Sequence, residues 1–223
     1  MRARKKKNLQ PRLERCKDYL TDKVVPEGEK PVWLEIGCGK GRFAVGMAEM
    51  FDVKYYAMEK VPDVMVMAAE KGVEAALPNL RFIIGDAGDL EAICPEHCVD
   101  VLFLTFSDPW PKKRDTKRRL TYRTFLDKYR RILKPEGHIF FKTDNEKLFR
   151  FSVEEFQANG YTLSDYTEDL HASGISNPVC TEYELRFTEL GQPIYHCKAH
   201  PVPGWTRPPE EEEKRSDIPE INQ

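Results

Sequence analysis

Apolar residues in this chain fall into short continuous runs, separated by segments in which they recur every three or four positions. The continuous runs predict buried β-strands at residues 31–36, 54–58, 80–84, 99–104 and 138–143. The intervening segments predict helices at residues 42–50, 63–71, 121–133 and 146–158, and a short helical turn at 89–93. This alternation is typical of a mainly parallel sheet covered by helices on both faces.

Both ends of the chain depart from this alternation. Residues 9–22 predict an amphipathic helix before the first strand. After Tyr161 we expect strands at 162–166 and 194–198, with a loop and then a helix from Thr181 between them. Two successive strands without a long crossover would close the sheet with an antiparallel edge. We therefore expect an α/β, doubly wound, Rossmann-like fold with a mostly parallel seven-stranded sheet and an antiparallel edge strand.

The termini differ in composition from the rest of the chain. We expect a single domain at residues 9–200, a basic disordered tail at 1–8 and an acidic, proline-rich disordered tail at 201–223. The basic N-terminus lacks the apolar segment of a secretory signal, and no run approaches the ~20 apolar residues of a membrane-spanning helix. The six scattered cysteines fit free thiols in a reducing compartment. We therefore expect a cytoplasmic protein without a membrane partner.

Net charge carries little information here, since 35 Lys and Arg residues balance 37 Asp and Glu residues to give −2. The distribution matters more, because charges of opposite sign are segregated along the chain. Among possible metal ligands, Cys94 and Cys98 resemble half of a zinc site, but no regular matching half follows. We therefore expect no metal.

A glycine-rich turn, Glu35-Ile-Gly-Cys-Gly-Lys-Gly41, follows the first of the continuous strands. Gly37, Gly39 and Gly41 would let the backbone approach a ligand closely, and the next helix would present free N–H groups. The dinucleotide fingerprint needs a further glycine at the position of Arg42, and the Gly-Lys-Ser/Thr of a P-loop is missing here. The sequence therefore disfavours both a dinucleotide-binding site and a P-loop at this turn.

Carboxylates follow the ends of successive predicted strands, where doubly wound folds bind their ligands. They are Glu35, Glu59, Asp86, Asp108 and Asp144. A carboxylate beside the glycines would repel a pyrophosphate but favour a cationic methionyl group. Glu59 is placed to accept hydrogen bonds from ribose hydroxyls, and Asp86 from an adenine amino group. These residues predict an S-adenosylmethionine site, and solvated carboxylates with no ligand are the alternative.

The loop that we expect after the fourth of these strands, residues 105–119, combines prolines with a cluster of cations. Pro109 and Pro111 should hold Asp108 and Trp110 extended, since a residue before proline avoids the α region. The cations are Lys112, Lys113, Arg114, Lys117, Arg118 and Arg119. Such a cluster beside a cleft suits a polyanion such as RNA, and an ordinary solvated basic face is the alternative.

Several motifs together resemble those of the bacterial tRNA (guanine-N7-)-methyltransferase family. They are Glu35-Ile-Gly-Cys-Gly-Lys-Gly41, Phe106-Ser-Asp-Pro-Trp-Pro-Lys-Lys-Arg114, Lys117-Arg-Arg119, Lys142-Thr-Asp-Asn145 and Thr181-Glu-Tyr-Glu184. The resemblance runs from about residue 30 to 200, and the second motif is long and specific. The family methylates N7 of guanine 46 in the tRNA variable loop with S-adenosylmethionine.

The resemblance implies roles for individual residues. Glu35, Glu59, Asp86 and Asp108 match the cofactor-contacting positions, and Asp108 also matches the proposed catalytic residue. The substrate-contacting positions match Lys112, Asp144, Thr181, Glu182, Tyr183 and Glu184. The family implies tRNA as the partner, with no obligatory protein partner and a monomer or homodimer. This chain departs from the family at Asp115, where a histidine is usual, so a possible cationic contact to RNA is lost.

Other interpretations of these residues remain open. Thr181 and Glu184 also have the spacing of a helix capping box. Trp110 and Tyr183 could each stack on an RNA base or pack within the protein. The basic N-terminus could reach RNA phosphates or be an idle tail. For the whole chain, the alternatives are a methyltransferase with another substrate and a non-catalytic RNA-binding protein.

Overall fold

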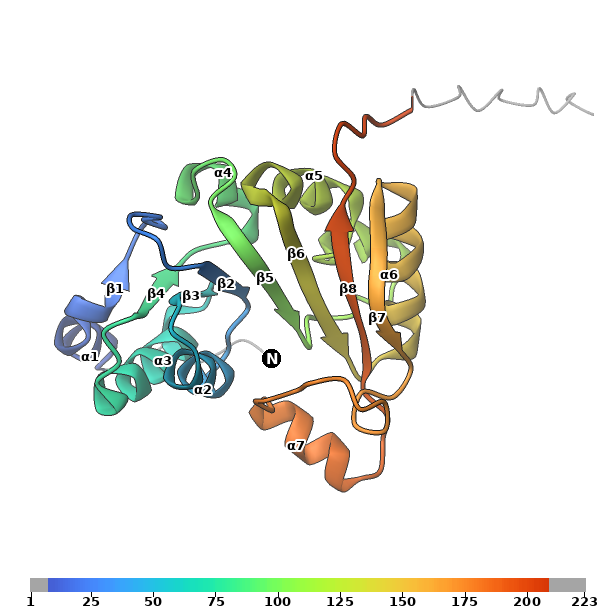
Figure 1. Ribbon diagram of the computed structural model, residues 1–223. Helices are drawn as coiled ribbons and strands as arrows, with labels where there is room; N and C mark the ends of the chain where they lie inside the picture. Colours follow the sequence, from blue (N-terminus) through green and yellow to red (C-terminus); the bar gives the residue numbers. More distant parts are fainter. Residues whose placement is uncertain (1–7, 209–223) are drawn as a thin grey trace, which may run out of the picture.

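The computed structural model describes residues 8–208, which form an α/β fold around one sheet (Figure 1). Its strands are β1 (Leu20–Thr21), β2 (Val32–Ile36), β3 (Lys54–Glu59), β4 (Leu80–Ile84), β5 (Val99–Thr105), β6 (Leu133–Thr143), β7 (Tyr161–Thr167) and β8 (Tyr195–Pro201). The order across the sheet is β1-β4-β3-β2-β5-β6-β8-β7. Strands β1 to β6 pair in parallel, whereas β8 is antiparallel to both of its neighbours. The expected doubly wound fold with an antiparallel edge is confirmed.

Helices cover both faces of this sheet. They are α1 (Leu9–Arg15), α2 (Arg42–Met50), α3 (Pro62–Ala75), α4 (Leu90–Ile93), α5 (Arg123–Ile132), α6 (Glu146–Ala158) and α7 (Glu182–Glu189). Alternate residues of β5 point to opposite faces. Val101 and Phe103 pack with residues of α2 and α3, whereas Leu102 and Leu104 pack with residues of α4, α5 and α6. A strand buried on both faces explains why the sequence showed continuous apolar runs.

The structure corrects several predicted boundaries. The helix expected at 9–22 ends at Arg15 and is followed by a 3-10 turn, Lys17–Tyr19. Residues 20–21 then pair with β4, so the sheet has eight strands and not seven. The helix expected at 121–133 begins at Arg123, and the strand expected at 138–143 begins at Leu133.

Gly137 lies in β6 at the register shift in the pairing with β5, between the partners of Val99 and Val101. A Cβ atom at this position would lie 2.9 Å from the Val99 carbonyl oxygen and 3.1 Å from that of Asp100. Only a glycine allows the two backbones to approach so closely. Gly137 therefore lies inside a strand.

Packed residues continue beyond residue 200, where we expected the domain to end. Strand β8 runs to Pro201, and the Trp205 ring lies 4.9 Å from the Arg130 guanidinium. Arg207 donates hydrogen bonds to Asp127 and Asn159. Most of the basic tail, residues 1–7, and residues 209–223 lie outside the described part. Between residues 8 and 208, no helix has the length and apolar character needed to cross a membrane.

The carboxyl ends of the parallel strands lie along one edge of the sheet. Helix α7 lies beyond the ends of β5 and β6 on this side, as Figure 1 shows. The chain reaches α7 from β7 through the loop at residues 168–181. This edge is where open α/β sheets bind their ligands.

Candidate active site

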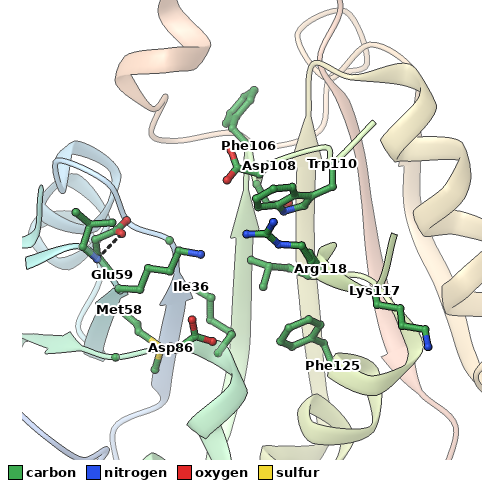
Figure 2. Close-up of a pocket in the computed structure, with 17 residues that line it drawn as sticks. Ile36, Met58, Glu59, Asp86, Phe106, Asp108, Trp110, Lys117, Arg118 and Phe125 are labelled. Carbon is green, nitrogen blue, oxygen red and sulfur yellow. Dashed lines mark hydrogen bonds between the residues drawn. The ribbon is translucent and has the colours of Figure 1, made fainter. Parts of the chain in front are cut away.

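Two cavities lie at the carboxyl edge of the sheet. The first, which we call the nucleoside cavity, has a volume of about 490 Å³, and its lining includes Gly37, Glu59, Asp86, Asp108, Lys117 and Arg118 (Figure 2). The second, the glycine-loop cavity, has a volume of about 420 Å³, and its lining includes Glu35, Gly37, Gly39, Gly41, Thr181 and Tyr183. Gly37 and Phe106 line both cavities. The structure thus brings four of the five strand-end carboxylates to adjoining cavities.

The three glycines of the turn have positive φ angles, of 82°, 56° and 78°. A Cβ atom on Gly37 or Gly39 would meet no heavy atom within 4 Å, so both face open space. On Gly41 it would lie 2.6 Å from Cβ of Ala68 in α3. Gly41 therefore permits close packing of α2 on α3, while the other two leave the backbone accessible to a ligand.

Backbone N–H groups hold two of the carboxylates in the nucleoside cavity. Glu59 accepts hydrogen bonds from the N–H groups of Val61 at 2.9 Å and Gly39 at 3.3 Å. Asp86 accepts one from the N–H of Gly88 at 2.8 Å. In Figure 2 both carboxylates lie on the side of the cavity opposite Trp110. Each keeps lone pairs for further donors, as the hydroxyl and amino groups of a nucleoside would require.

Glu35 lies beside the glycine-loop cavity and is almost completely buried, with 1% of its surface exposed. Its carboxyl group accepts hydrogen bonds from the hydroxyls of Tyr55 and Thr105, each at 3.2 Å. Desolvation outweighs these bonds and raises the pKa of Glu35 to about 7. A cationic ligand would therefore favour the ionised form of this group.

The loop that carries Asp108, residues 107–110, has an unusual backbone at its last residue and at the residue that precedes it. Trp110 has a φ angle of 41° and Phe106 one of 53°, in the left-handed region that few non-glycine residues adopt. The expectation that Trp110 would be extended is therefore wrong. Arg119 holds this loop through two hydrogen bonds. Its Nε donates to the Pro109 carbonyl at 3.0 Å and its Nη2 to the Trp110 carbonyl at 3.1 Å.

The Trp110 side chain packs against a cation of the same segment. The Arg118 guanidinium lies 3.5 Å from the centre of its ring, and both residues line the nucleoside cavity (Figure 2). This is close enough for a cation–π interaction. In this structure Trp110 therefore packs on Arg118 rather than in the apolar core.

The cationic segment contains a 3-10 helix, Lys113–Arg118, in the region that we read as a loop. Lys112, Lys113 and Arg114 are exposed and line neither cavity, whereas Lys117 and Arg118 line the nucleoside cavity. Asp115 lies 3.8 Å from Arg118 and 3.9 Å from Arg114, so it reduces the positive potential locally.

Thr181 and Glu184 form the capping box at the start of α7. The Glu184 N–H donates to the Thr181 hydroxyl at 2.9 Å, and the Thr181 N–H donates to the Glu184 carboxylate at 3.2 Å. Glu184 is fully buried and also accepts hydrogen bonds from Lys142 at 2.6 Å and Asn177 at 2.7 Å. In this conformation its oxygens bind protein groups. A direct contact with a base, one of the options from sequence, would require these bonds to break.

The other residues matched to substrate positions differ in exposure. Tyr183 is 48% exposed, and its ring centre lies 5.4 Å from that of Phe106. Asp144 is partly buried, and desolvation raises its pKa. It lines neither cavity, and the Glu182 side chain lies outside the described part.

The structure offers one group of possible metal ligands among the described residues: His171, Cys180 and Glu184, whose ligand atoms lie within 4.8 Å of one another. The ammonium group of Lys142 already neutralises this carboxylate. Cys94 and Cys98, which we considered as half of a zinc site, are both buried free thiols.

Several residues that line the cavities were not predicted from the sequence. Phe106 lines both cavities, and Arg42 and Arg186 line the glycine-loop cavity. No local pattern indicated the two arginines. Lys142 did have a signal, because a lysine inside the apolar run of β6 must find a buried partner.

Comparison with known protein families identifies one match across most of the chain. Residues 29–197 match the model of a family described as putative methyltransferase. Among solved structures, an antibiotic-related methyltransferase has a TM-score of 0.58 at 16% identity, covering 82% of this chain and 96% of that one. A SAM-dependent methyltransferase from Aquifex aeolicus has a TM-score of 0.55 at 14% identity, covering 86% and 88%. At these identities the likeness concerns the fold.

Curated relatives are more similar in sequence. The tRNA (guanine-N(7)-)-methyltransferase of Streptococcus mutans is 40% identical over 211 residues, covering 89% of this chain and 99% of its own. The proteins of the same name from Brevibacillus brevis and Exiguobacterium sibiricum are 44% and 46% identical. They cover 76% and 78% of this chain, and 80% and 82% of their own.

Proposed function

The chain belongs to the tRNA (guanine-N(7)-)-methyltransferase family, and from this we propose that it transfers a methyl group from S-adenosylmethionine to N7 of guanine 46 in the variable loop of tRNA. The observation that carries the proposal is the convergence of Glu35, Glu59, Asp86 and Asp108 on adjoining cavities bordered by cations. A tRNA substrate implies a cytoplasmic protein. We retain the expectation of a monomer or homodimer without an obligatory protein partner.

The two cavities suit the two halves of the donor. Their volumes of about 490 and 420 Å³ are in the range of small-molecule sites. In the nucleoside cavity, Glu59 would accept hydrogen bonds from the ribose hydroxyls and Asp86 one from the adenine amino group. In the glycine-loop cavity, Gly37 and Gly39 would admit the methionyl chain, and ionised Glu35 would balance its positive charge.

The chemistry requires little proton transfer from the protein. When bound, S-adenosylmethionine supplies a methyl group on a sulfonium cation. Guanine N7 has an in-plane lone pair, so the side chains need not deprotonate it. Their task is to align the base for in-line displacement and to face the positive charge as it moves. Asp108, which lines the nucleoside cavity and is exposed, is the carboxylate that we assign to this role.

Two carboxylates, those of Asp108 and Asp144, are the groups that we assign to the selection of guanine over adenine. Asp108 and Asp144 would accept hydrogen bonds from guanine N1–H and the 2-amino group. Partial burial raises the pKa of Asp144, so its poorly solvated carboxylate gains from such donors. Adenine has an acceptor at N1 and no amino group at C2. It would leave a carboxylate unpaired, at a cost of about 1–3 kcal/mol.

Residues around the cavities would hold the rest of the tRNA. The exposed residues Lys112, Lys113 and Arg114 would contact phosphates, with Lys117 and Arg118 nearer the cavity. Thr181 and Tyr183 line the glycine-loop cavity and would contact the variable loop. Glu184 would fix the start of α7 through its bonds to Thr181 and Lys142.

The test is incubation of the purified protein with methyl-labelled donor and unmodified tRNA transcripts, followed by nucleoside analysis. We expect 7-methylguanosine, and its loss when guanine 46 of the transcript is replaced by adenine. Equal methylation of both transcripts would disprove the assignment of position 46. RNA binding without methyl transfer would favour the non-catalytic interpretation. Transfer to protein or small molecules alone would favour another substrate.

A further inference from the structure

We infer that Arg119 is a positioning residue, whose guanidinium fixes the Asp108 loop (residues 107–110) through the carbonyls of Pro109 and Trp110. This separates Arg119 from the cations before it in sequence, with which we had grouped it as an RNA contact. The inference rests on the proposed function, because it concerns how Asp108 is held for that reaction.

The guanidinium is committed to contacts within the protein. Its Nε and Nη2 atoms reach the carbonyl oxygens of the two residues that follow Asp108, at 3.0 and 3.1 Å. The group also lies 4.3 Å from the centre of the Phe151 ring in α6. Arg119 is only partly exposed. A phosphate would have to compete with all of these contacts.

The backbone of Arg119 is also hydrogen-bonded to its neighbours. Its N–H donates to the Thr116 carbonyl at 3.1 Å, and its carbonyl accepts from the Tyr122 N–H at 2.9 Å. These bonds connect it to the 3-10 helix Lys113–Arg118 on one side and to the start of α5 on the other. The guanidinium that contacts the loop therefore belongs to a residue whose backbone is hydrogen-bonded on both sides.

The loop needs such a donor because of its own sequence. Pro109 and Pro111 have no N–H group, so the backbone cannot anchor the loop by donating at those positions. Phe106 and Trp110, on either side of Asp108, both have left-handed φ angles. Such conformations persist only when surrounding contacts hold them. The Phe106 N–H bond to the Lys142 carbonyl, 2.9 Å long, anchors one end, and Arg119 anchors the other.

A lysine could not replace this arginine. Arginine presents N–H groups in a planar fork that spans two neighbouring acceptors, whereas lysine offers one compact ammonium group. Arg119→Lys therefore keeps the charge that a phosphate contact would use and removes the fork that the loop uses. The two roles predict different kinetics for this one variant.

The experiment compares wild type with Arg119→Lys for kcat, for KM with tRNA, and for the salt dependence of tRNA binding. We expect kcat to fall at least tenfold, with KM within twofold and an unchanged salt slope. Arg114→Ala, which removes an exposed cation, should instead weaken tRNA binding and reduce the slope by about one. Arg150→Lys, on the exposed surface of α6, controls for the exchange itself and should match wild type.

Phe151→Leu provides a second variant if Arg119→Lys does not fold. It removes the ring beside the guanidinium without changing charge, and we expect a smaller fall in kcat with unchanged tRNA affinity. Near-wild-type kcat in the folded variants would overturn the inference, as would a loss confined to tRNA affinity. If the wild type itself transfers no methyl group, the proposed function fails. The salt slope of Arg119→Ala then still decides, since an unchanged slope would support the positioning role and a slope reduced by about one would assign Arg119 to phosphate.

Discussion

Lys142 Nζ lies 2.6 Å from Glu184 Oε2, and neither side chain is exposed to solvent. The pair joins the carboxyl end of β6 to the first turn of α7. Lys142 also donates to the side-chain oxygen of Asn177 at 3.0 Å and to the Val179 carbonyl at 3.3 Å. One buried ammonium group thus holds the whole segment that carries Thr181 and Tyr183 over the glycine-loop cavity.

Removing the lysine should destabilise the protein strongly. Lys142→Met would leave the Glu184 carboxylate buried without its counter-charge, and breaking such a pair costs about 3–5 kcal/mol. Urea denaturation measures this loss. The double variant Lys142→Met, Glu184→Gln should lose less than the sum of the single variants, because the orphaned charge is gone. Loss of less than about 1 kcal/mol in Lys142→Met would mean that the pair contributes little.

The affinity for S-adenosylmethionine should rise between pH 6 and pH 8. Burial raises the pKa of Glu35 to about 7, so below that pH the carboxyl group is mostly protonated. A cationic ligand that pairs with the ionised carboxylate must then displace a proton, which weakens its binding. Calorimetry in buffers of different ionisation enthalpy should detect this proton release. Glu35→Gln should abolish both the release and the pH dependence. Equal affinity of the wild type at pH 6 and pH 8 would show that Glu35 does not face the ligand's charge.

Acid should destabilise the fold through His196. This side chain is fully buried, donates from Nδ1 to the Phe141 carbonyl at 2.9 Å, and has a pKa lowered to about 4 by desolvation. In the unfolded chain its pKa is near 6.5, so its contribution to stability is present above 6.5 and is lost as the pH falls toward 4. The loss approaches about 3 kcal/mol. His196→Asn, which can keep the bond to Phe141, should flatten the dependence of the unfolding free energy on pH. A slope equal to that of wild type would assign the acid sensitivity to other groups.

Asp115 should weaken tRNA binding, because its carboxylate lies within 4 Å of Arg114 and Arg118. Asp115→Asn should raise tRNA affinity about threefold at low salt, consistent with the small energies of exposed ion pairs. The gain should shrink as salt is added. Asp52→Asn, which changes an exposed carboxylate that is also paired with a cation, serves as the matched control. A gain of the same size in both variants would reflect net charge alone.

Features set by neighbouring residues were predictable from the sequence. The glycine turn and the carboxylates that follow the strands are local patterns, and the structure brings four of those five carboxylates to adjoining cavities. The short strand β1 was not predictable, because two residues cannot show a periodicity. It forms through pairing with β4, whose paired residues lie 62 positions further along the chain.

Long-range partners explain the other differences. The proline rule predicts an extended Trp110, but hydrogen bonds from Arg119 and the ring contact with Arg118 accompany a left-handed backbone there. The sequence showed the capping box of Glu184, yet its buried partner Lys142 lies 42 residues earlier. Local patterns predict which side chains could carry the chemistry, whereas tertiary contacts decide which of these side chains remain available to a ligand.

The role of Asp108 in methyl transfer is tested most directly with the variant Asp108→Asn. In one preparation, calorimetry measures its affinity for the donor, and a single-turnover assay measures its methylation of tRNA. Asp108 should serve the reacting base more than the bound donor, so we expect affinity within a few-fold of wild type. Turnover should fall about a hundredfold, as when one transition-state contact is lost. Turnover close to that of wild type would contradict the role of Asp108. A wild-type protein that binds no donor would contradict the proposed methyl transfer itself.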